Sequence, residues 1–289
     1  MATEFDTPAT VRAWSDATRA SGRTIALVPT MGALHRGHLE LIRTARRLAD
    51  AVVVSIFVNP LQFGERSDFE HYPRPIDDDV RACDDEGVDA VFVPTAASMY
   101  PAGFATTVRV AGLTDTMEGS ARPGHFDGVT TVVTKLLVAT RPHIAVFGEK
   151  DYQQLAVVRL LVTDLDLGVD IVEHPTVREP DGLAMSSRNR RLDARQRAAA
   201  ACVPRALAAG RAAARSDGSS VADVIEAAAG ALDAEALADR EYVALFDADT
   251  LVPIDRLDVD QRRPGRVRLP VAARFGDVRL IDNADLFAP

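Results

Sequence analysis

Short apolar runs alternate with longer helical patterns over the first 175 residues of the chain. A run of four to eight apolar residues is typical of a buried strand, whereas apolar residues repeated every three to four positions are typical of an amphipathic helix. The runs predict strands at 25–29, 52–58, 90–93, 107–110, 143–147 and 170–172. The helical patterns predict helices at 38–49, 76–86, 129–139 and 152–165. This alternation predicts an α/β fold with a parallel sheet that helices cover on both faces.

The pattern changes after about residue 175. We expect an alanine-rich helix at 193–215 and a second helix at 221–232, separated by Asp217-Gly218-Ser219-Ser220. Strand-like runs then occupy 242–246, 266–275 and 278–281. Helices followed by a small meander indicate a separate α+β unit. We therefore expect a Rossmann-like, doubly wound domain over residues 1–176 and a smaller C-terminal α+β domain over residues 177–289.

Composition narrows the partners and the compartment. The chain has 33 Lys and Arg against 42 Asp and Glu, a net charge of −9, so a nucleic acid would gain no electrostatic support. Two distant cysteines do not indicate a disulfide framework, and the first residues lack the pattern of a signal peptide. No run approaches the roughly 18 apolar residues of a membrane span. We expect a cytoplasmic protein with neither nucleic acid nor membrane as partner.

The first candidate site follows the first predicted strand. Residues 29–38 read Pro-Thr-Met-Gly-Ala-Leu-His-Arg-Gly-His and lead into a helical pattern. A strand that passes through a glycine-containing turn into a helix directs backbone N–H groups and the positive helix end at one point, which suits a phosphate. His38 stands where a Walker P-loop has lysine, and no Ser or Thr follows it to hold magnesium. This argues against a Walker kinase or ATPase.

The two histidines of this turn, His35 and His38, suit the stabilisation of charge on a phosphate during its transfer. They would alternatively be two ligands of a metal, or one helix cap and one surface histidine. Cys83 and Cys202 lie far from this turn in the sequence, so the thiolates of a structural zinc site are missing. We therefore favour the phosphate role.

Two further polar clusters also follow predicted strands or open helices. The segment Gly148-Glu149-Lys150-Asp151-Tyr152-Gln153-Gln154 offers a glycine for close approach of a ligand, an acid after it for ribose hydroxyls and a lysine for a phosphate. Its alternative interpretation is a helix start capped by Asp151. The segment Met185-Ser186-Ser187-Arg188-Asn189 offers two hydroxyls and a guanidinium on a loop that can move, which suits a phosphate clamp. Its alternative is a surface loop that caps the helix after Leu192.

Two more segments carry amides or a histidine. Residues 57–63, Phe-Val-Asn-Pro-Leu-Gln-Phe, end a strand with amides that can bind a small polar substrate. Residues 122–129, Arg-Pro-Gly-His-Phe-Asp-Gly-Val, open a helix, and the role of Arg122 and His125 cannot be read from the sequence. An NAD-binding domain is disfavoured because no G-x-G-x-x-G follows the first strand.

Taken together and in order, these five segments closely resemble the pantothenate synthetase family, the pantoate–β-alanine ligases. The resemblance is dense over residues 24 to about 192 and extends to the C-terminal unit only in its layout. It implies a nucleotidyltransferase-type HIGH motif at residues 35–38 and a KMSKS-type mobile loop at residues 185–188. Arg36 departs from the acid that the family often shows, with little expected consequence. The mobile loop has no lysine, so Lys150 and Arg188 would carry its charge.

The resemblance implies an enzyme that converts pantoate, β-alanine and ATP into pantothenate, AMP and pyrophosphate through a pantoyl adenylate. The residues it implies for ATP are Met31, His35, His38, Gly148, Lys150, Asp151, Val177, Met185, Ser186, Ser187 and Arg188. Of these, charge stabilisation in catalysis would fall to His35, His38, Lys150, Ser186, Ser187 and Arg188. The residues it implies for pantoate are Met31, Phe57, Asn59, Gln62, Val133 and Gln154. It also implies Mg²⁺ bound mainly through the phosphates of ATP, a C-terminal domain that acts as a lid, and a homodimer.

Two rival classes remain open from the sequence. A nucleotidyltransferase that keeps the nucleotidyl group on its product would need a cationic pocket for a phosphorylated acceptor, whereas the amides at 59–62 favour a polyol acid. A non-catalytic nucleotide sensor would tolerate loss of a histidine or of the Ser-Ser-Arg loop, and both are present here. Free AMP as a product would distinguish the ligase from the transferase.

Overall fold

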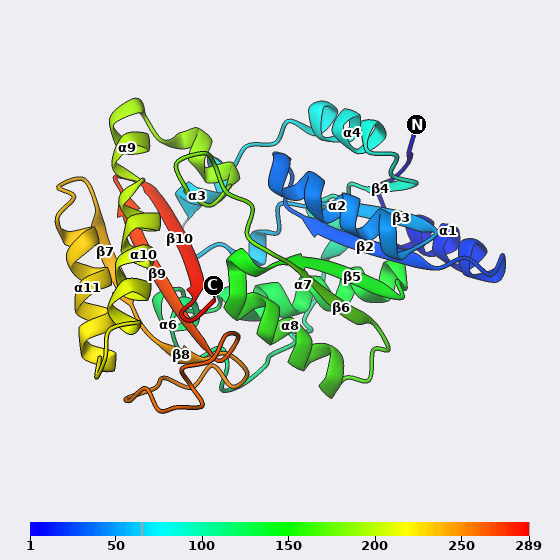
Figure 1. Ribbon diagram of the computed structural model, residues 1–289. Coiled ribbons are helices and arrows are strands. Elements are labelled where there is room, and N and C mark those ends of the chain that lie inside the picture. The colour runs from blue at the N-terminus through cyan, green and yellow to red at the C-terminus, as the bar shows by residue number, and fades with distance from the viewer. Residues whose placement is uncertain (65, 289) are drawn as a thin grey trace. The chain divides into compact units, whose positions relative to one another are not determined.

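The computed structural model describes residues 1–64 and 66–288, and the chain divides into two compact units (Figure 1). The first unit comprises Met1–Glu149 and Gln153–Pro175, and the second comprises Lys150–Tyr152 and Thr176–Pro289. The short segment Lys150–Tyr152, expected in the first domain, therefore groups with the second unit. Along the parts of the chain that are described, no helix is both long and apolar enough to cross a bilayer.

The first unit is built on a six-stranded sheet in which every neighbouring pair is parallel. Its strands are β1 (Thr3–Phe5), β2 (Ile25–Thr30), β3 (Ala51–Ile56), β4 (Ala90–Phe92), β5 (Ile144–Gly148) and β6 (Asp170–His174). Their order is β1-β4-β3-β2-β5-β6. The chain moves outward from β2 to β4 and then returns to β5 on the other side of β2. The strand order therefore reverses between β2 and β5, where ligands bind in folds of this type.

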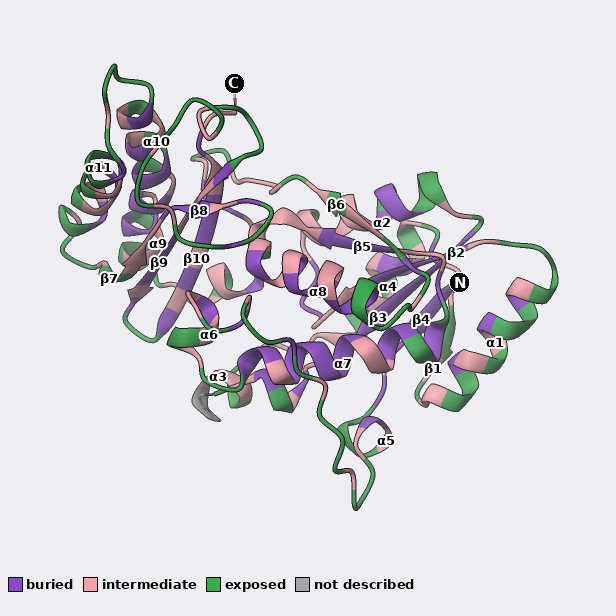
Figure 2. Ribbon diagram, turned by 90° about the horizontal axis from the view of Figure 1, so that it is seen from below, coloured by how far each residue is buried: buried purple, intermediate pink, exposed green. Residues whose placement is uncertain are grey.

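The helices of the first unit are in the segments that connect these strands. They are α1 (Pro8–Ala20), α2 (Arg36–Leu48), α3 (Arg66–Glu70), α4 (Ile76–Asp85), α5 (Ala96–Met99), α6 (Glu118–Ala121), α7 (His125–Thr140) and α8 (Tyr152–Asp164), with 3-10 turns η1 (Pro60–Gln62) and η2 (Glu149–Asp151). Helices α2 and α4 share a core with one face of the sheet, and α7 and α8 lie on the other side (Figure 1). Figure 2 shows α7 buried along most of its length, as its apolar sequence requires. The α/β, doubly wound fold is confirmed.

Residues 107–110 do not form the strand that their alternating pattern predicts. The segment instead lies along α7, where threonines satisfy its backbone. Thr131 Oγ1 accepts a hydrogen bond from the Val108 N–H at 3.0 Å, and the Thr130 hydroxyl donates to the Val108 carbonyl at 2.5 Å. Because these side chains replace a neighbouring strand, the segment needs no place in the sheet.

Two N-terminal elements, β1 and α1, were not predicted from the sequence patterns. Strand β1 has three residues, too few for a periodic signal, and pairs with β4. Helix α1 follows a readable start signal, because Thr7 caps it through the Thr10 N–H and Pro8 occupies the first turn.

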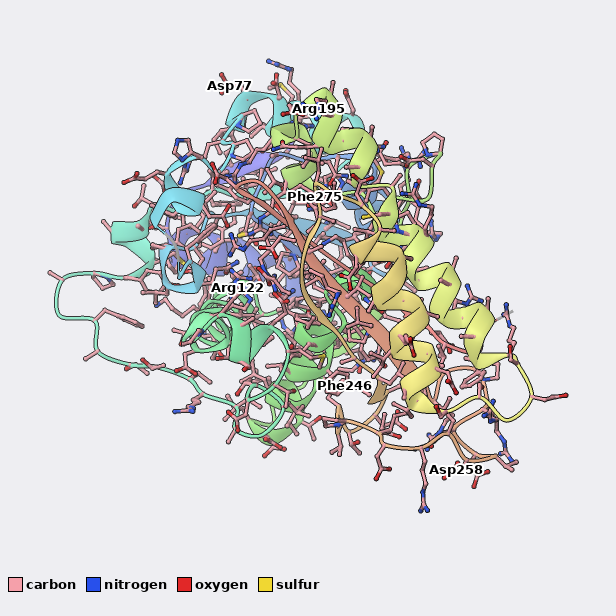
Figure 3. All side chains as sticks on the ribbon, turned by 90° about the vertical axis from the view of Figure 1, so that its left-hand side faces the viewer. Asp77, Arg122, Arg195, Phe246, Asp258 and Phe275 are labelled. Atoms are coloured by element: carbon pink, nitrogen blue, oxygen red, sulfur yellow. The ribbon has the colours of Figure 1, made fainter. Side chains whose placement is uncertain are left out.

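The second unit consists of an antiparallel sheet with helices packed on it. Its elements are η3 (Ser187–Arg191), α9 (Ala194–Ala199), α10 (Cys202–Ala214), α11 (Val221–Asp233), β7 (Asp239–Val243), β8 (Phe246–Asp247), β9 (Val267–Phe275) and β10 (Val278–Asp285). The strand order is β10-β9-β7, with β8 also paired to β9. Figure 3 labels Phe246 and Phe275 on this sheet; both side chains are buried, and Phe275 belongs to the unit's hydrophobic core.

The single helix expected at 193–215 is two helices, α9 and α10. Pro204 lies in the first turn of α10, where its missing N–H costs nothing. Inside a continuous helix its ring would clash with the carbonyl of Ala200. The break at residues 200–201 is therefore a local consequence of the sequence, and the expectation of one helix was wrong.

Candidate functional site

The turn after β2 brings two histidine rings together. His35 is the N-cap of α2, and His38 occupies the third position of the helix. The rings stack with their centroids 4.0 Å apart and their planes at 28°. Both side chains are partly exposed, as is required of groups that contact a ligand, whereas Arg36 between them is exposed.

Backbone contacts set the tautomer of both rings. Nδ1 of His35 accepts from the Gly37 N–H at 3.2 Å, and Nδ1 of His38 accepts from the His35 N–H at 3.3 Å. A backbone N–H can only donate, so each Nδ1 is without hydrogen, and in the neutral ring Nε2 carries it. Each histidine therefore offers an Nε2–H donor, which suits a phosphate oxygen and is unsuited to ligating a metal.

Asp79 supports this turn from α4, and sequence reasoning missed it. Its Oδ2 accepts from the Ala33 N–H and its Oδ1 from the Leu34 N–H, both at 2.7 Å, and the residue is 2% exposed. One sequence signal could have found it. Asp79 is the third of three consecutive acids, and it lies four residues before Cys83, on the same buried face of α4. A carboxylate there must be paired, because burial of an unpaired charge is costly.

Five backbone N–H groups of the turn donate to side chains of the protein, whereas the sequence predicts that N–H groups here face a phosphate. Those of Ala33 and Leu34 donate to Asp79, that of Gly32 donates to Thr30 Oγ1, and those of His35 and Gly37 donate to the ring nitrogens. The turn is thus pre-organised by its own side chains. The groups it offers a phosphate are the imidazole donors and the positive end of α2.

A second cluster of the first unit follows β3. Asn59 is 1% exposed, and its Nδ2 donates to Gln62 Oε1 and to the Gly128 carbonyl, both at 3.0 Å. Its Oδ1 accepts from the Leu61 N–H at 3.2 Å and from the Tyr100 hydroxyl at 2.7 Å. Asn59 was expected to contact substrate, but its hydrogen-bonding groups are all used inside the protein. Asn59 thus holds the side-chain oxygen of Gln62, and its expected contact with a substrate stays a prediction.

The other residues that the sequence predicts to bind the small acid substrate differ in their contacts and burial. Gln62 Nε2 approaches Met31 Sδ at 2.9 Å, which joins η1 to the turn after β2. Phe57 and Val133 are buried, with Phe57 against the ring of Tyr100. Gln154 is partly exposed in the first turn of α8.

The neighbour of Gln154, Gln153, has a structural role. It is buried and its amide holds the backbone before and within α6, accepting from the Glu118 N–H and donating to the carbonyls of Leu113 and Thr116. The amide of Gln153 is therefore occupied within the protein, and the expected contact of Gln154 with a substrate stays a prediction.

In the second unit, residues 150–152 are anchored to the antiparallel sheet. Asn283 of β10 donates to the Lys150 carbonyl at 2.9 Å, and the Tyr152 hydroxyl donates to the Ala248 carbonyl at 3.0 Å. The Arg268 guanidinium lies 4.1 Å from the centre of the Tyr152 ring. Asp151 is exposed at the end of η2, directly before the first residue of α8.

The segment with the two serines continues from a small hairpin. The Met185 N–H donates to the Val177 carbonyl at 2.9 Å, and Arg178 and Ala184 form a bridge. The Arg178 side chain pairs with buried Asp282 of β10 at 2.6 Å. The adjacent residues Asp282 and Asn283 therefore hold both the hairpin and Lys150.

The serines differ in environment. Ser186 Oγ accepts from the Arg188 N–H at 3.3 Å and caps η3, whereas Ser187 is 6% exposed. The helix that follows is capped by Asp193, which rules out the interpretation of this loop as that cap.

The expected residues thus fall into two groups. The first unit holds Met31, His35, His38, Phe57, Asn59, Gln62, Val133, Gly148 and Gln154; the second holds Lys150, Asp151, Val177, Met185, Ser186, Ser187 and Arg188. Within the first unit, the turn after β2 lies at the carboxyl edge of the sheet where the strand order reverses.

Comparison with known sequences gives one consistent family. The family model described as pantoate-beta-alanine ligase matches residues 3–285. The pantothenate synthetase of Rhizorhabdus wittichii is 51% identical over 265 residues, which cover 92% of this chain and 92% of that protein. The pantothenate synthetase of Nocardia farcinica is 51% identical over 276 residues, which cover 96% of this chain and 83% of that protein.

Solved structures agree with the sequences. The crystal structure of pantothenate synthetase from Thermus thermophilus superposes with a TM-score of 0.91 at 45% identity, covering 99% of this chain and 100% of that one. The pantoate-beta-alanine ligase of Francisella tularensis, complexed with beta-gamma ATP and β-alanine, superposes with a TM-score of 0.82 at 31% identity. That match covers 100% of this chain and 99% of that one.

Proposed function

This chain belongs to the pantoate-beta-alanine ligase family, and from that premise we propose that it condenses pantoate with β-alanine through a pantoyl adenylate, releasing AMP and pyrophosphate. The observation that carries the adenylate is the pair of imidazole Nε2–H donors at the end of β2. The complex of the F. tularensis ligase with beta-gamma ATP and β-alanine supports the same two substrates here.

The first step makes the carboxylate reactive. A carboxylate is a poor acylating agent because its leaving group would be oxide. In the proposed step a pantoate oxygen attacks the α-phosphorus, the bond from that phosphorus to the bridging oxygen breaks, and pyrophosphate leaves. Negative charge shifts to the leaving oxygen and to the non-bridging oxygens. We assign its stabilisation to His35 and His38, together with the cations Lys150 and Arg188 and the hydroxyls of Ser186 and Ser187.

The pantoate is proposed to lie against Gln62 and Gln154, whose amides can bind its hydroxyls and carboxylate. Gln62 presents its NH₂ group next to Met31, because its oxygen is taken by Asn59. Met31, Phe57 and Val133 supply apolar surface for the dimethyl carbon. Asp151, with the backbone near Gly148, Val177 and Met185, is proposed to hold the adenosine.

In the second step the amine of β-alanine attacks the acyl carbon of the adenylate. The bond from that carbon to the AMP oxygen breaks, and the nitrogen loses a proton as the amide forms. No nucleophilic side chain is needed. Water would hydrolyse the same adenylate, so we propose that the loop at 185–189 and the C-terminal unit exclude water during the reaction.

Magnesium is proposed to arrive with ATP. Within the described residues, no group of three or more His, Cys, Asp and Glu is arranged to hold a metal. Mg²⁺ commonly binds proteins through one or two carboxylates together with the phosphates of a substrate. When bound, the ion would neutralise part of the phosphate charge. We further propose a homodimer, as the family resemblance implies, and a cytoplasmic location, where ATP is abundant.

An isotope experiment tests the reaction path. Pantoate labelled with ¹⁸O in both carboxylate oxygens should place one label in AMP, one in the amide of pantothenate and none in pyrophosphate. Mass spectrometry of the products from one incubation measures this distribution. Label in inorganic phosphate would indicate an acyl phosphate instead, and unlabelled AMP would exclude the adenylate. Omitting β-alanine is the control, because the enzyme-bound adenylate should then accumulate.

A further inference from the structure

Gln62 is held from two sides by residues with no role so far. Asn59 donates a hydrogen bond to the side-chain oxygen of Gln62, and Tyr100 in turn donates to Asn59. The side chains of His125 and Arg122 bond the backbone carbonyl of Gln62. We propose that Tyr100 and His125 are positioning residues that fix the Gln62 amide with its NH₂ group toward the substrate. This inference rests on the proposed function, which assigns pantoate to Gln62.

The orientation of the Gln62 amide follows from groups whose roles are unambiguous. The Leu61 N–H can only donate and the Gly128 carbonyl can only accept, so their contacts fix which end of the Asn59 amide is oxygen. Asn59 must then donate to Gln62 through its remaining hydrogen. Gln62 therefore uses its oxygen internally, and its NH₂ group approaches Met31 Sδ, a weak acceptor. A substrate oxygen would be a stronger partner for that NH₂ group.

Tyr100 begins the series of hydrogen bonds that runs through Asn59 to Gln62. Its hydroxyl donates to Asn59 Oδ1 at 2.7 Å, and it supplies the second of the two hydrogen bonds that this oxygen accepts. The ring is held by Phe57 and Phe104, at centroid distances of 6.1 and 5.1 Å, and Lys135 Nζ lies 5.9 Å from its centre. Burial raises the pKa of the Tyr100 hydroxyl, so it remains a donor at neutral pH.

His125 secures the backbone of Gln62. Its Nδ1 lies 2.8 Å from the Gln62 carbonyl, and its Nε2 lies 3.2 Å from Arg122 Nη1. A guanidinium can only donate, so Nε2 accepts and Nδ1 carries the hydrogen that bonds Gln62. Arg122, which lies between α6 and α7 (Figure 3), donates to the same carbonyl at 3.2 Å.

The first turn of α7 is built for this contact. A Cβ at Gly128 would lie 2.3 Å from the Leu61 carbonyl oxygen and 2.6 Å from the Gln62 nitrogen, so glycine is required there. The segment 122–129, whose role the sequence left open, thus docks directly on η1, the turn that carries Gln62. Two independent sets of contacts thus converge on Gln62, one on its side-chain oxygen and one on its backbone carbonyl, which a general folding role does not require.

The main test is Tyr100→Phe, which removes one hydroxyl and keeps the ring. We expect kcat/KM for pantoate to fall about tenfold, the ordinary effect of losing one hydrogen bond, with KM for ATP changed by less than about twofold. Thr163→Val, which removes a hydroxyl that bonds a carbonyl within α8, is the control and should alter neither value. Equal losses for both substrates, or no loss for pantoate, would overturn the proposal.

A double-mutant cycle shows whether Tyr100 acts through Gln62. In a Gln62→Ala background, Tyr100→Phe should have almost no further effect on kcat/KM for pantoate. Additive losses would mean that Tyr100 acts elsewhere. Should Gln62→Ala itself leave pantoate kinetics intact, the pantoate assignment of the proposed function would fail; loss in Gln62→Ala without loss in Tyr100→Phe would remove only the positioning role.

His125 offers a rescue test. Asparagine can place a donor near the position of Nδ1, whereas leucine cannot. We expect His125→Leu to lower kcat/KM for pantoate about tenfold or more, and His125→Asn to recover at least part of that loss. Thermal unfolding is measured on both variants, because equal destabilisation with unequal kinetics separates positioning from folding. Identical kinetics of the two variants would contradict the role of the Nδ1 donor.

Discussion

Asp79 and Gly32 lie in direct contact beneath the histidine turn, where a Cβ on Gly32 would stand 2.8 Å from Asp79 Oδ2. Gly32 has a φ of +80°, and Ala33 after it has a φ of +50°. The backbone is thus left-handed at both residues, next to the buried carboxylate of Asp79. This carboxylate accepts hydrogen bonds from the N–H groups of Ala33 and Leu34. This contact places His35 at the start of α2.

The first prediction concerns this carboxylate. Asp79→Asn puts an NH₂ group against a backbone N–H, so one strong hydrogen bond is lost and a donor is left facing a donor. We expect the free energy of unfolding to fall by about 1.5–3 kcal/mol and adenylate formation to slow. Urea denaturation and single-turnover rates measure the two effects. Asp78→Asn, at an exposed neighbour, is the control, and equal behaviour of both variants would contradict the support role.

The second prediction separates the two nitrogens of His38. In the proposed mechanism the His38 ring contacts charge that develops in the transition state. His38→Ala should therefore raise the barrier to adenylate formation by about 2.7–4 kcal/mol and change ATP affinity little. Glutamine can place a donor near Nε2, and asparagine can place an acceptor near Nδ1. We expect His38→Gln to recover part of the rate and His38→Asn to recover none. Single-turnover rates with ATP-binding titrations decide it, and recovery by asparagine alone would assign the effect to the turn.

The third prediction concerns the pair of Arg178 and Asp282 in the second unit. Asp282 is buried, and the guanidinium it holds fixes the hairpin before Ser186. Asp282→Asn should reduce the free energy of unfolding by about 1.5–3 kcal/mol, the range for hydrogen bonds to charged groups, and raise KM for ATP. Asp277→Asn, in the exposed turn between β9 and β10, should change neither. An unchanged KM for ATP with reduced stability would restrict the pair to folding.

The fourth prediction is a pH dependence of stability. Burial, together with the nearby Arg19 charge, lowers the pKa of His143, whose Nδ1 accepts from the Ile25 N–H at 3.0 Å. Below about pH 6.5 the unfolded chain therefore binds a proton at this residue more readily than the folded one, and stability falls as the pH is lowered. His143→Asn keeps an acceptor and removes the titration. Its free energy of unfolding should change less between about pH 7.5 and about pH 5.5, one unit either side of that value, than that of the wild type. Parallel curves would refute the prediction.

The sequence by itself determined the parts of this protein that depend on neighbouring residues. Apolar periodicity predicts five of the six strands of the parallel sheet and the helices after β2 and β5. Glycine and capping residues predict the histidine turn. The break before Pro204 was equally local and was readable from the position of that proline. The five motifs also carried the family, which the comparisons confirm.

Only the tertiary structure decided how the candidate site is supported. Asp79 reaches Ala33 across 46 residues, Tyr100 reaches Asn59 across 41 and His125 reaches Gln62 across 63. Periodicity reports which face of an element is buried, but it carries no information about which distant side chain meets that face. Asn59 illustrates the difference. The sequence predicts that it contacts substrate, whereas in the fold its side-chain amide bonds four other groups of the protein. Residues 107–110 show the same limit, because threonines of α7 took the place of a neighbouring strand.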